Sequence, residues 1–340
     1  MTGFGGRLLA KAFDSVTQLP VNSESRSQLR VAADAAVANP GAESCAAIAA
    51  VVETDPILAS LVLREASVVH PADSVLAAIE RIGAAGVREL VGELDAYDGL
   101  NPGTPDYVRL ELFRIHAAAT ARLAREVARS AGQAQLTDQI VSAALLHDIG
   151  RLVIIELHGD TYGPSWPGET PDERLARERR ELGIDHAMVG GVLVRRWGVD
   201  RDLATAVERH HASGGDVASQ IIRLADAIVH RNEGAPIPGD HLIETAAACG
   251  IDEDELRTIV YRSTSGDQTS DKTVIEPCPL SPREMDALRA LASGKVYKEI
   301  AAELGLSVST VRTHLHNIYR KVGAADRAQA VLTATSKGWL

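Results

Sequence analysis

Histidine and aspartate residues recur through the middle of this chain in positions that suggest a common site. Each of them falls on or beside a segment with helical periodicity, so a helical bundle can direct all of them inward. A histidine–aspartate pair ends the apolar segment that begins at Ala144, and a pair of adjacent histidines follows farther along. The set comprises His116, His147, Asp148, His186, His210, His211 and Asp226.

These residue types suit metal chemistry. Neutral imidazoles combined with carboxylates bind first-row ions such as iron, manganese, zinc or nickel. Several imidazoles and two carboxylates inside a helical bundle would be poorly satisfied without a cation, because buried charges have to be paired or coordinated. A single histidine is more often an ordinary core or surface residue than a ligand, and we interpret four others in this way: His70, His158, His230 and His241.

The elements that would position these residues are helical. Hydrophobic residues make up 45% of the 340 residues, aromatic residues make up 4%, and alanine runs are common. Alanine is the best helix former and strand-like alternation is scarce, so we predict an all-α fold. Asp55 and Pro56 are typical of a helix start, with a capping side chain and a proline in the first position. Apolar spacing predicts helices over residues 26–37, 46–52, 56–65, 110–130, 136–147, 186–197, 202–211 and 218–231.

The C-terminal part of the chain carries a different pattern. Residues 282–291 and 297–304 form two predicted helices, and Gly305 ends the second of them. Ser307 is predicted to cap a third helix that runs to residue 322. Two short helices joined by a glycine turn are typical of a helix-turn-helix, whose second helix enters the major groove of duplex DNA.

Charge is unevenly distributed along the chain and sets the same C-terminal part apart. From Ser281 to Leu340 there are 9 basic and 5 acidic residues, a net charge of +4, whereas the remainder has 26 basic and 41 acidic residues, a net charge of −15. A weakly basic module on an acidic body suits a nucleic-acid partner for the module alone. Residues 263–279 are polar and rich in turn formers. We therefore predict a domain over 1–262, a linker over 263–279 and a domain over 280–340.

Several features point to the cytoplasm. The three cysteines Cys45, Cys249 and Cys278 are widely spaced and form neither a disulfide framework nor a zinc-ribbon pattern, which suits a reducing compartment. The first residues lack the apolar core of a signal peptide, and no stretch approaches the ~20 apolar residues of a membrane span. Residues 101–105 read as a loop inside the larger domain. We expect a cytoplasmic protein that has no membrane partner.

The C-terminal motif resembles the LuxR-type family of DNA-binding domains. The resemblance implies a four-helix domain that reads duplex DNA with its third helix and forms a homodimer through its fourth helix, about residues 326–336. It is carried by Leu280-Ser-Pro-Arg-Glu284, Lys298-Glu-Ile-Ala301, Ser309-Thr-Val-Arg-Thr-His314, Asn317-Ile-Tyr-Arg-Lys321, Arg327-Ala-Gln-Ala330 and Gly338.

The same resemblance implies which side chains touch DNA. Arg312 can donate two hydrogen bonds to a guanine edge, whereas contacts to the DNA backbone fix position without reading sequence. The alternative is a helix-turn-helix kept for protein contact only. Carried over by position, the resemblance implies base contacts by Arg312, Thr313 and His316, and backbone contacts by Lys298, Thr310, Arg320 and Lys321.

The body of the chain resembles the HD superfamily of metal-dependent phosphohydrolases, and within it the HDOD subgroup, which couples such a domain to signalling output. The order of residues matches that superfamily: a histidine, a His-Asp pair, further histidines and an aspartate. The resemblance runs over about Leu19 to Tyr261. Its clearest segments are Leu145-Leu-His-Asp-Ile-Gly-Arg-Leu152, Leu182-Gly-Ile-Asp-His-Ala-Met-Val-Gly190, Trp197 and His210-His211.

This resemblance implies one or two divalent transition metal ions. Asp148 would bridge two ions, because a carboxylate has two oxygens to share. Two ions ~3.5–4 Å apart can activate a water and hold a phosphate, and Asp148 and Arg151 would then be the catalytic residues of a hydrolase. The implied metal ligands are His116, His147, Asp148, His186, His210, His211 and Asp226.

One hydrolase class is disfavoured by the residues around this set. HD hydrolases of the cyclic-di-nucleotide class often have lysine where this chain has Arg151, and an arginine grips phosphate with a planar fork rather than a point charge. The Gly-Tyr-Pro motif of that class is absent, since His210-His211 is followed by Ala-Ser-Gly-Gly. A cyclic-di-nucleotide phosphodiesterase is therefore disfavoured.

We expect a bacterial one-component transcription regulator. Its C-terminal domain would bind specific duplex DNA as a homodimer, and its HD-type domain would bind metal and sense a phosphate-containing, nucleotide or other small ligand. Two alternatives stay open: an active metal-dependent phosphohydrolase with a DNA-binding tail, and a metal-free HDOD scaffold for protein interaction. Metal analysis separates the scaffold from the other two, and turnover assays separate the hydrolase.

Overall fold

The computed structural model describes residues 3–94, 105–159, 169–265, 280–292, 295, 297–322, 324, 330–331 and 334. No β-strand occurs in these ranges, and the predicted all-α class is confirmed. None of the helices found there has both the length and the apolar character that crossing a membrane requires. The elements are α1 (Gly3–Val16), α2 (Ser23–Ala38), α3 (Ala42–Val52), α4 (Pro56–Ala66), α5 (Val75–Glu93), α6 (Pro105–Ser130), the 3-10 helix η2 (Ala134–Leu136), α7 (Thr137–Leu146), α8 (Ile149–His158), α9 (Pro171–Leu182), α10 (His186–Arg196), α11 (Arg201–Arg209), α12 (Val217–Asn232), α13 (Gly239–Ala248), α14 (Glu253–Ser265), α15 (Pro282–Ala292), α16 (Tyr297–Leu304) and α17 (Val308–Val322).

The chain divides into two compact units. One contains residues 1–99 and 112–265, and the other contains residues 100–111 and 266–340. Helix α14 ends at Ser265, so the first three residues of the predicted linker 263–279 are helical. The rest of that linker lies outside the described residues, as does the predicted loop 101–105 except for Pro105, which begins α6.

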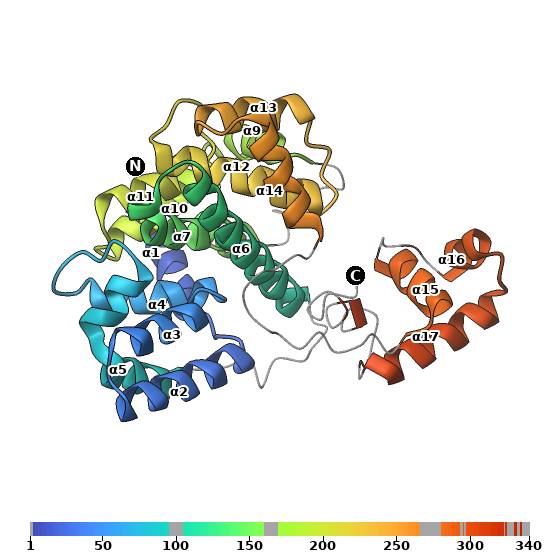
Figure 1. Ribbon diagram of the computed structural model, residues 1–340, viewed down its shortest axis with the longest axis horizontal. Helices are drawn as coiled ribbons and strands as arrows, with labels where there is room; N and C mark the ends of the chain where they lie inside the picture. The colour runs from blue at the N-terminus through green and yellow to red at the C-terminus, as the bar shows by residue number, and fades with distance from the viewer. Residues whose placement is uncertain are drawn as a thin grey trace. The chain divides into compact units, whose positions relative to one another are not determined.

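Helices α2 to α5 of the first unit pack against one another and lie together in Figure 1. The start of α4 has the predicted cap, because Asp55 accepts hydrogen bonds from the backbone N–H groups of Ile57 at 2.9 Å and Leu58 at 3.3 Å. Helix α5 is kinked at Gly83, whose φ of 72° lies in the left-handed region that favours glycine. Helices α4 and α5 also contact α7, so this group of helices supports the second half of the unit.

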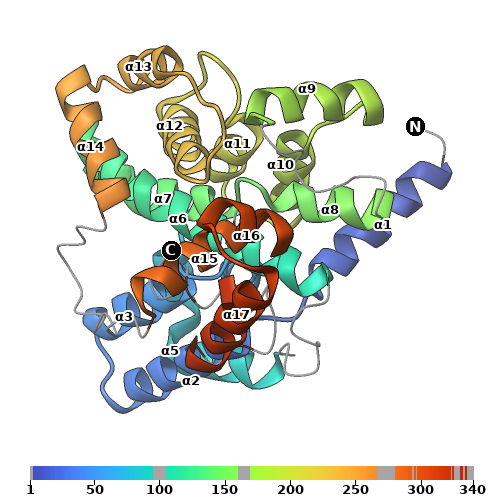
Figure 2. The same cartoon turned by 90° about the vertical axis from the view of Figure 1, so that its right-hand side faces the viewer.

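The second half of the first unit is a helical bundle, seen from two sides in Figures 1 and 2. Helix α10 packs on both α8 and α11, and α11 packs on α7 and α12. The backbones of α8 and α10 approach each other at Gly150 and Gly190. A Cβ added to Gly150 would lie 2.6 Å from the backbone nitrogen of Gly190, and closer still to the backbone carbonyl of His186. Only a glycine at this position allows the two helices to pack at backbone distance.

Candidate metal centre and nucleic-acid interface

The histidines and aspartates singled out from the sequence meet in one cluster inside the first unit. All of them are buried except His211, which is half-buried. Neighbouring imidazole ring centroids lie 4.1 to 5.5 Å apart. The members are His116 on α6, His147 and Asp148 at the junction of α7 and α8, His186 at the start of α10, His210 and His211 after α11, and Asp226 on α12.

Asp148 stands between two groups of histidines. Its Oδ1 lies 3.2 Å from Nε2 of His186, while its Oδ2 lies 3.8 Å from Nε2 of His147 and 3.9 Å from Nε2 of His116. Arg151, one turn along α8, donates to Oδ2 at 2.6 Å. Burial works against ionisation, but the positive charge of Arg151 and the surrounding histidines outweigh it and hold the pKa of Asp148 well below its usual value. Asp148 is therefore an ionised carboxylate that faces both groups.

Asp226 is the second anionic residue of the cluster. Its Oδ1 lies 3.1 Å from Nε2 of His116 and 3.5 Å from Nε2 of His147. His230, one turn further along α12, places its Nε2 3.3 Å from the same oxygen. Sequence reasoning interpreted His230 as an ordinary residue. It lies on the same face of α12 as Asp226, because i and i+4 positions of a helix share one face. Burial opposes ionisation of Asp226, but the adjacent histidines, His230 first, outweigh it and lower its pKa well below the usual value.

Backbone carbonyls hold two of the histidines from outside. Nδ1 of His147 donates to the carbonyl oxygen of Ala144, and Nδ1 of His210 donates to that of Val207, each at 2.7 Å. Each carbonyl lies one turn earlier on the helix that ends at that histidine. The two rings are therefore held with Nδ1 at the carbonyl and Nε2 directed inward.

Two glutamates hold further histidines in the same way. Glu178 on α9 accepts from Nδ1 of His186 at 2.7 Å and from the backbone N–H of His186 at 2.7 Å. Glu233, at the end of α12, accepts from Nδ1 of His116 at 3.0 Å. Such carboxylate–histidine pairs are typical of histidines that ligate metals. Sequence reasoning missed both glutamates; the spacing of Glu233 from Asp226 along α12 was the one available signal.

The inner nitrogens show why the cluster suits a metal ion. Among the described residues, Nε2 of His147 and Nε2 of His210 are buried without a hydrogen-bond partner. Nε2 of His186 and Nε2 of His211 lie 3.1 Å apart. Burial, helped by the nearby histidines, lowers the pKa of His210 to about 3, so this ring is neutral at physiological pH. Neutral imidazoles beside ionised carboxylates are ligands that first-row transition metals prefer.

Two rings of the cluster have both nitrogens directed at carboxylates. Burial lowers the pKa of His116 and of His186, but the carboxylates around each ring outweigh it and raise the pKa to about 10 for His116 and about 9 for His186. A metal ion bound at Nε2 of either ring would have to displace a proton. Metal binding at this cluster would therefore be coupled to proton release.

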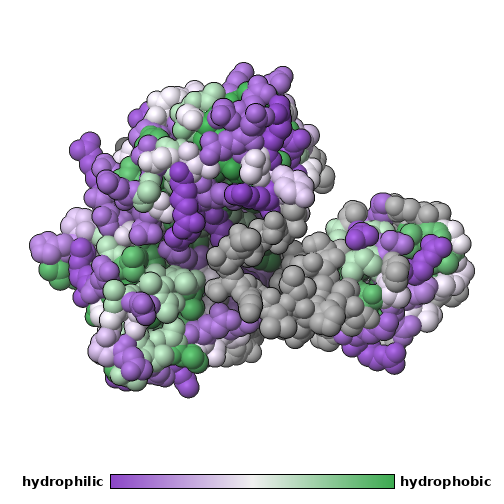
Figure 3. Space-filling model, viewed as in Figure 1, coloured by the Kyte–Doolittle hydropathy of each residue, from purple (hydrophilic) through white to green (hydrophobic). Residues whose placement is uncertain are grey.

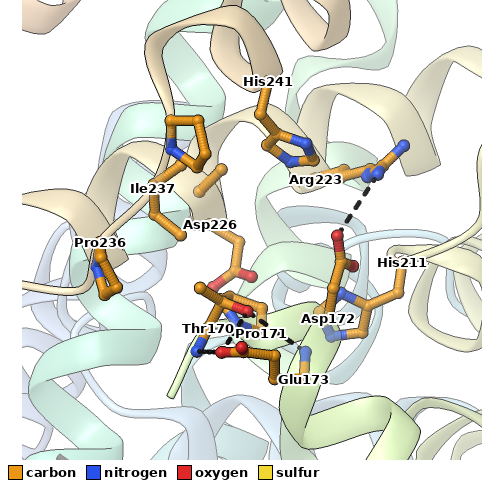
Figure 4. A pocket seen from close by; sticks show the side chains of 12 residues that line it. Thr170, Pro171, Asp172, Glu173, His211, Arg223, Asp226, Pro236, Ile237 and His241 are labelled. Atoms are coloured by element: carbon orange, nitrogen blue, oxygen red, sulfur yellow. Dashed lines mark hydrogen bonds and ion pairs between the residues drawn. The ribbon is translucent and has the colours of Figure 1, made fainter. Parts of the chain in front are cut away.

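A cavity of about 420 Å³ reaches the edge of the cluster. Figure 4 shows His211 and Asp226 on its wall, together with His241 at the start of α13. Arg223 of α12 also lines it and pairs with Asp172 of α9 at 3.9 Å. A small molecule in this cavity would touch two members of the cluster.

The second unit contains the helix-turn-helix expected from the sequence. Helices α16 and α17 are joined at Gly305, whose φ is 65°, and both pack with α15. Ser307 caps α17 as predicted, because its Oγ accepts from the backbone N–H of Thr310 at 3.1 Å. Only residues 330, 331 and 334 of the predicted fourth helix are described, and they are helical. The shared core includes Leu288, Leu291, Ile300, Val311, Leu315 and Ile318.

The side chains implied for DNA contact lie mainly on the surface of this module. Figure 3 shows hydrophilic side chains along α17 on the face in view. Thr310 is half-buried, and the side chain of His316 lies outside the described residues. The exposed members are Lys298 on α16 and Arg312, Thr313, Arg320 and Lys321 on α17.

Lys321 has a structural contact that the sequence did not reveal. Its Nζ donates to Oε2 of Glu284 at 2.7 Å, which links the end of α17 to the start of α15. The same carboxylate oxygen accepts from the backbone N–H and the hydroxyl of Ser281, both at 2.8 Å. Burial acts to raise the pKa of Glu284, but these bonds from Lys321 and Ser281 outweigh it and lower the pKa to about 2.

We expect Glu284→Gln to loosen the module at neutral pH and to change its response to acid. Because the pKa of Glu284 falls from 4.5 to about 2 on folding, the carboxylate stabilises the fold above pH ~4.5. This contribution is lost as the pH falls from ~4.5 through ~2. Amide hydrogen exchange in peptides covering α15 and α17 should be faster in the variant at neutral pH, and the difference should shrink in acid. An equal difference at every pH would contradict the argument.

Comparisons with known proteins find a matching family model for each of the two parts of the chain. The model of the family described as "HDOD domain" matches residues 27–213, more than half of the chain, so this chain belongs to the HDOD domain family. The model described as "Bacterial regulatory proteins, luxR family" matches residues 278–334. Both resemblances drawn from the sequence are confirmed.

Curated relatives are similar over parts of the chain. The probable HTH-type transcriptional regulator GfsR of Streptomyces halstedii is 36% identical over 152 residues, which is 44% of this chain and 54% of that protein. The uncharacterized transcriptional regulatory protein YvfU of Bacillus subtilis is 44% identical over 62 residues, 18% of this chain and 31% of that protein. The matches therefore span between about a third and about half of these relatives.

Solved structures share the fold. The MmoQ response regulator of Methylococcus capsulatus has a TM-score of 0.53 at 21% identity, covering 72% of this chain and 98% of that one. A virulence factor of Campylobacter jejuni has a TM-score of 0.55 at 17% identity, covering 78% of this chain and 99% of that one. At these identities the likeness concerns the fold alone.

Proposed function

We propose that this protein is a one-component transcription regulator, in which a helix-turn-helix binds duplex DNA under the control of an HDOD body. The observation that carries the proposal is the folded helix-turn-helix, whose α17 presents Arg312 and Thr313 to solvent. The match to the luxR family and the similarity to transcriptional regulators support it. The net charge of +4 on residues 281–340 favours contact with DNA phosphates. In this proposal the protein acts in the cytoplasm. A homodimer would read an inverted repeat with its recognition helices ~34 Å apart.

We expect Arg312→Ala to weaken specific DNA binding by about 1–3 kcal/mol and to relax the preference at one base position. The reason is that a guanidinium can donate two hydrogen bonds to a guanine edge, and alanine can donate none. The measurement is selection of binding sites from random duplexes by the full-length protein, followed by titration of the selected site at several salt concentrations.

Lys298→Ala serves as the matched control for this experiment. An exposed lysine that contacts phosphate should weaken binding to all sequences alike and reduce the salt dependence by about one counterion. Lys321 is less suitable as a control, because its ammonium group is bonded to Glu284. Failure of the full-length protein to select any sequence would overturn the proposed function, and an unchanged base preference in Arg312→Ala would overturn the role of Arg312.

We further propose that the HDOD body binds one or two divalent transition metal ions: iron, manganese, zinc or nickel. The unpaired Nε2 atoms of His147 and His210 support this, as does the pair of ionised carboxylates. When bound, such an ion supplies a Lewis acid that can polarise a phosphate oxygen or a water. The residues that would hold it are His116, His147, Asp148, His186, His210, His211 and Asp226.

The signal in this proposal is a small ligand that enters the cavity beside the cluster. The cavity supports this because His211 and Asp226 line it together with Arg223, a cation that suits a phosphate or carboxylate group. The ligand would then contact the metal centre and helices α9 and α12 at the same time. Its binding energy could change the packing of those helices.

An active phosphohydrolase is the second candidate, and one contact favours it. Arg151 lies against Asp148, 2.6 Å from its Oδ2, where it could grip a phosphate group beside the metal ligands. Turnover of nucleotides and phosphate esters by metal-loaded protein, with Asp148→Asn as the control, tests this candidate. Absence of stoichiometric metal after offering manganese, iron, zinc and nickel would leave the interaction scaffold as the role of the body.

A further inference from the structure

The cluster is in contact with one histidine, His230, that the family order of residues does not include. His230 lies on α12, beyond residues 27–213 that match the HDOD model. It is 9% exposed, and its ring packs against that of His116 at a centroid distance of 4.5 Å, with the two ring planes tilted by 36°. Its Nε2 is directed at Asp226 Oδ1, from 3.3 Å. This contact places His230 beside the cluster.

Three imidazoles converge on a single oxygen at this end of the cluster. Oδ1 of Asp226 lies 3.1 Å from Nε2 of His116, 3.3 Å from Nε2 of His230 and 3.5 Å from Nε2 of His147. All three rings present the same nitrogen. His116, His147 and Asp226 each place one ligand atom within 4.8 Å of the others, and His230 contacts the same aspartate oxygen. Three imidazoles and one carboxylate are ligands of the kind that zinc and other first-row ions take.

Glu233 contacts the outer nitrogen, Nδ1, of two of these rings. Its Oε1 accepts from Nδ1 of His116 at 3.0 Å, and its Oε2 lies 3.3 Å from Nδ1 of His230. One carboxylate therefore holds both Nδ1 atoms, so that both Nε2 atoms are left to face Asp226. Outer carboxylates of this kind orient ligating imidazoles and raise their basicity.

The other end of the cluster has the same composition. His186, His210 and His211 can bring their ring nitrogens within 4.8 Å of one another. Oδ1 of Asp148 lies 3.2 Å from Nε2 of His186. Glu178 holds His186 from behind, as Glu233 does at the first end. The two ends therefore have the same composition: three imidazoles, one aspartate and one outer glutamate each.

We propose that His230 is a metal ligand and completes a second three-histidine site, formed by His116, His147, His230 and Asp226, beside the site formed by His186, His210, His211 and Asp148. This inference rests on the proposed metal centre and assigns it two ions, with Asp148 Oδ2 facing the second site. The cavity touches one ligand of each site, since His211 and Asp226 both line it. A small anion there would contact a residue of each proposed site.

The test counts ions in the full-length protein. Metal-free wild type is titrated with Co²⁺, followed by calorimetry and by the visible absorption of the bound ion, and with Zn²⁺, followed by elemental analysis after desalting. Wild type should take up two ions. His230→Ala and His230→Gln should each take up one, with loss of one of two Co²⁺ absorption components. His241→Ala, which changes another histidine on the cavity wall, should still take up two.

Each outcome bears on the inference. Two ions in both His230 variants would show that His230 only pairs with Asp226 and Glu233, and would overturn it. Uptake of a single ion by wild type would also overturn it, while leaving the proposed metal centre intact. Uptake of no ion by wild type would overturn both the role of His230 and the proposed metal centre. Glu233→Gln should keep two ions with a weaker second affinity, because the inference assigns Glu233 to the orientation of His116 and His230 and not to the ligands. Melting curves of all variants without metal show whether each is folded.

Discussion

The combined change His147→Ala and Asp148→Asn is expected to remove all bound metal from this protein and to abolish its thermal stabilisation by metal. Asp148 lies within 3.9 Å of Nε2 atoms from His116, His147 and His186, so it belongs to both ends of the cluster. His147 supplies one of the two unpaired Nε2 atoms. Among the described residues, no other pair of adjacent residues in the cluster contacts as many residues of the proposed metal sites.

The expected size of the thermal effect follows from mass action. A metal present at 100 times its dissociation constant stabilises the folded state by about 2.7 kcal/mol. For a unit of this size each kcal/mol moves the melting temperature by about 2–4 °C. Wild type should therefore gain about 5–10 °C on adding metal, and the double variant should gain none. The shift is measured within each protein, so any change in metal-free stability cancels.

The exposed histidine His70 provides the matched control. His70→Ala should keep both the metal content and the shift of wild type, because its side chain lies outside the cluster. The double variant should also select the same DNA sites as wild type if its helix-turn-helix remains folded. Stoichiometric metal in the double variant, or a melting temperature of wild type that chelators leave unchanged, would show that the cluster is not a metal site.

The helices were predictable from the sequence where local signals agreed. Helices α4 and α17 begin at the predicted caps, Asp55 and Ser307, because a capping side chain and an apolar pattern coincide there. Helix α8 was missed because it follows α7 directly, with only His147 and Asp148 between them and no turn residue to mark its start. Helix α9 was also missed, because it is polar on most positions, although Thr170 and Glu173 form a capping box at its start.

The sequence allowed prediction of the seven cluster residues that follow the family order, but not of the residues that contact and support them. The seven residues in family order were visible because their types and sequence match a known arrangement. His230 was not, since a lone histidine carries no signal until Asp226 is known to face inward from the same helix. Glu178 gave no signal at all: it is fully buried on a helix of charged residues, where a solvent-exposed position is the usual expectation.

Lys321 shows the same limit in the second unit. Its place in the motif implies a phosphate contact, and its exposed side chain agrees with that role. The bond from Nζ to Glu284 joins residues 37 positions apart, so no local pattern predicts it. A charge that family position assigns to DNA therefore also fastens two helices of its own module. The consequence is that loss of DNA binding on changing Lys321 does not by itself establish a phosphate contact.

Gly150→Ala is expected to be among the most destabilising single substitutions in the first unit. The added Cβ would lie 2.6 Å from the backbone nitrogen of Gly190 and closer still to the backbone carbonyl of His186. Backbone atoms on a packed helix cannot rotate away as a side chain can, so α8 and α10 must separate. Overpacking typically costs 1–3 kcal/mol, and we expect about 3 kcal/mol or more here, measured by denaturant unfolding. Since Asp148 precedes and His186 faces this contact, metal uptake should fall as well.

Two further glycines make the test quantitative. A Cβ on Gly190 would meet its nearest neighbours at 3.2 to 3.4 Å, so Gly190→Ala should destabilise less than Gly150→Ala. A Cβ on Gly92 of α5 would meet no atom within 4 Å, so Gly92→Ala should be neutral or stabilise by up to about 1 kcal/mol, because alanine favours helix. The free energy of unfolding should therefore be highest for Gly92→Ala, lower for Gly190→Ala and lowest for Gly150→Ala. If Gly150→Ala unfolds like Gly92→Ala and binds as much metal as wild type, then the close approach of α8 and α10 does not position the ligands.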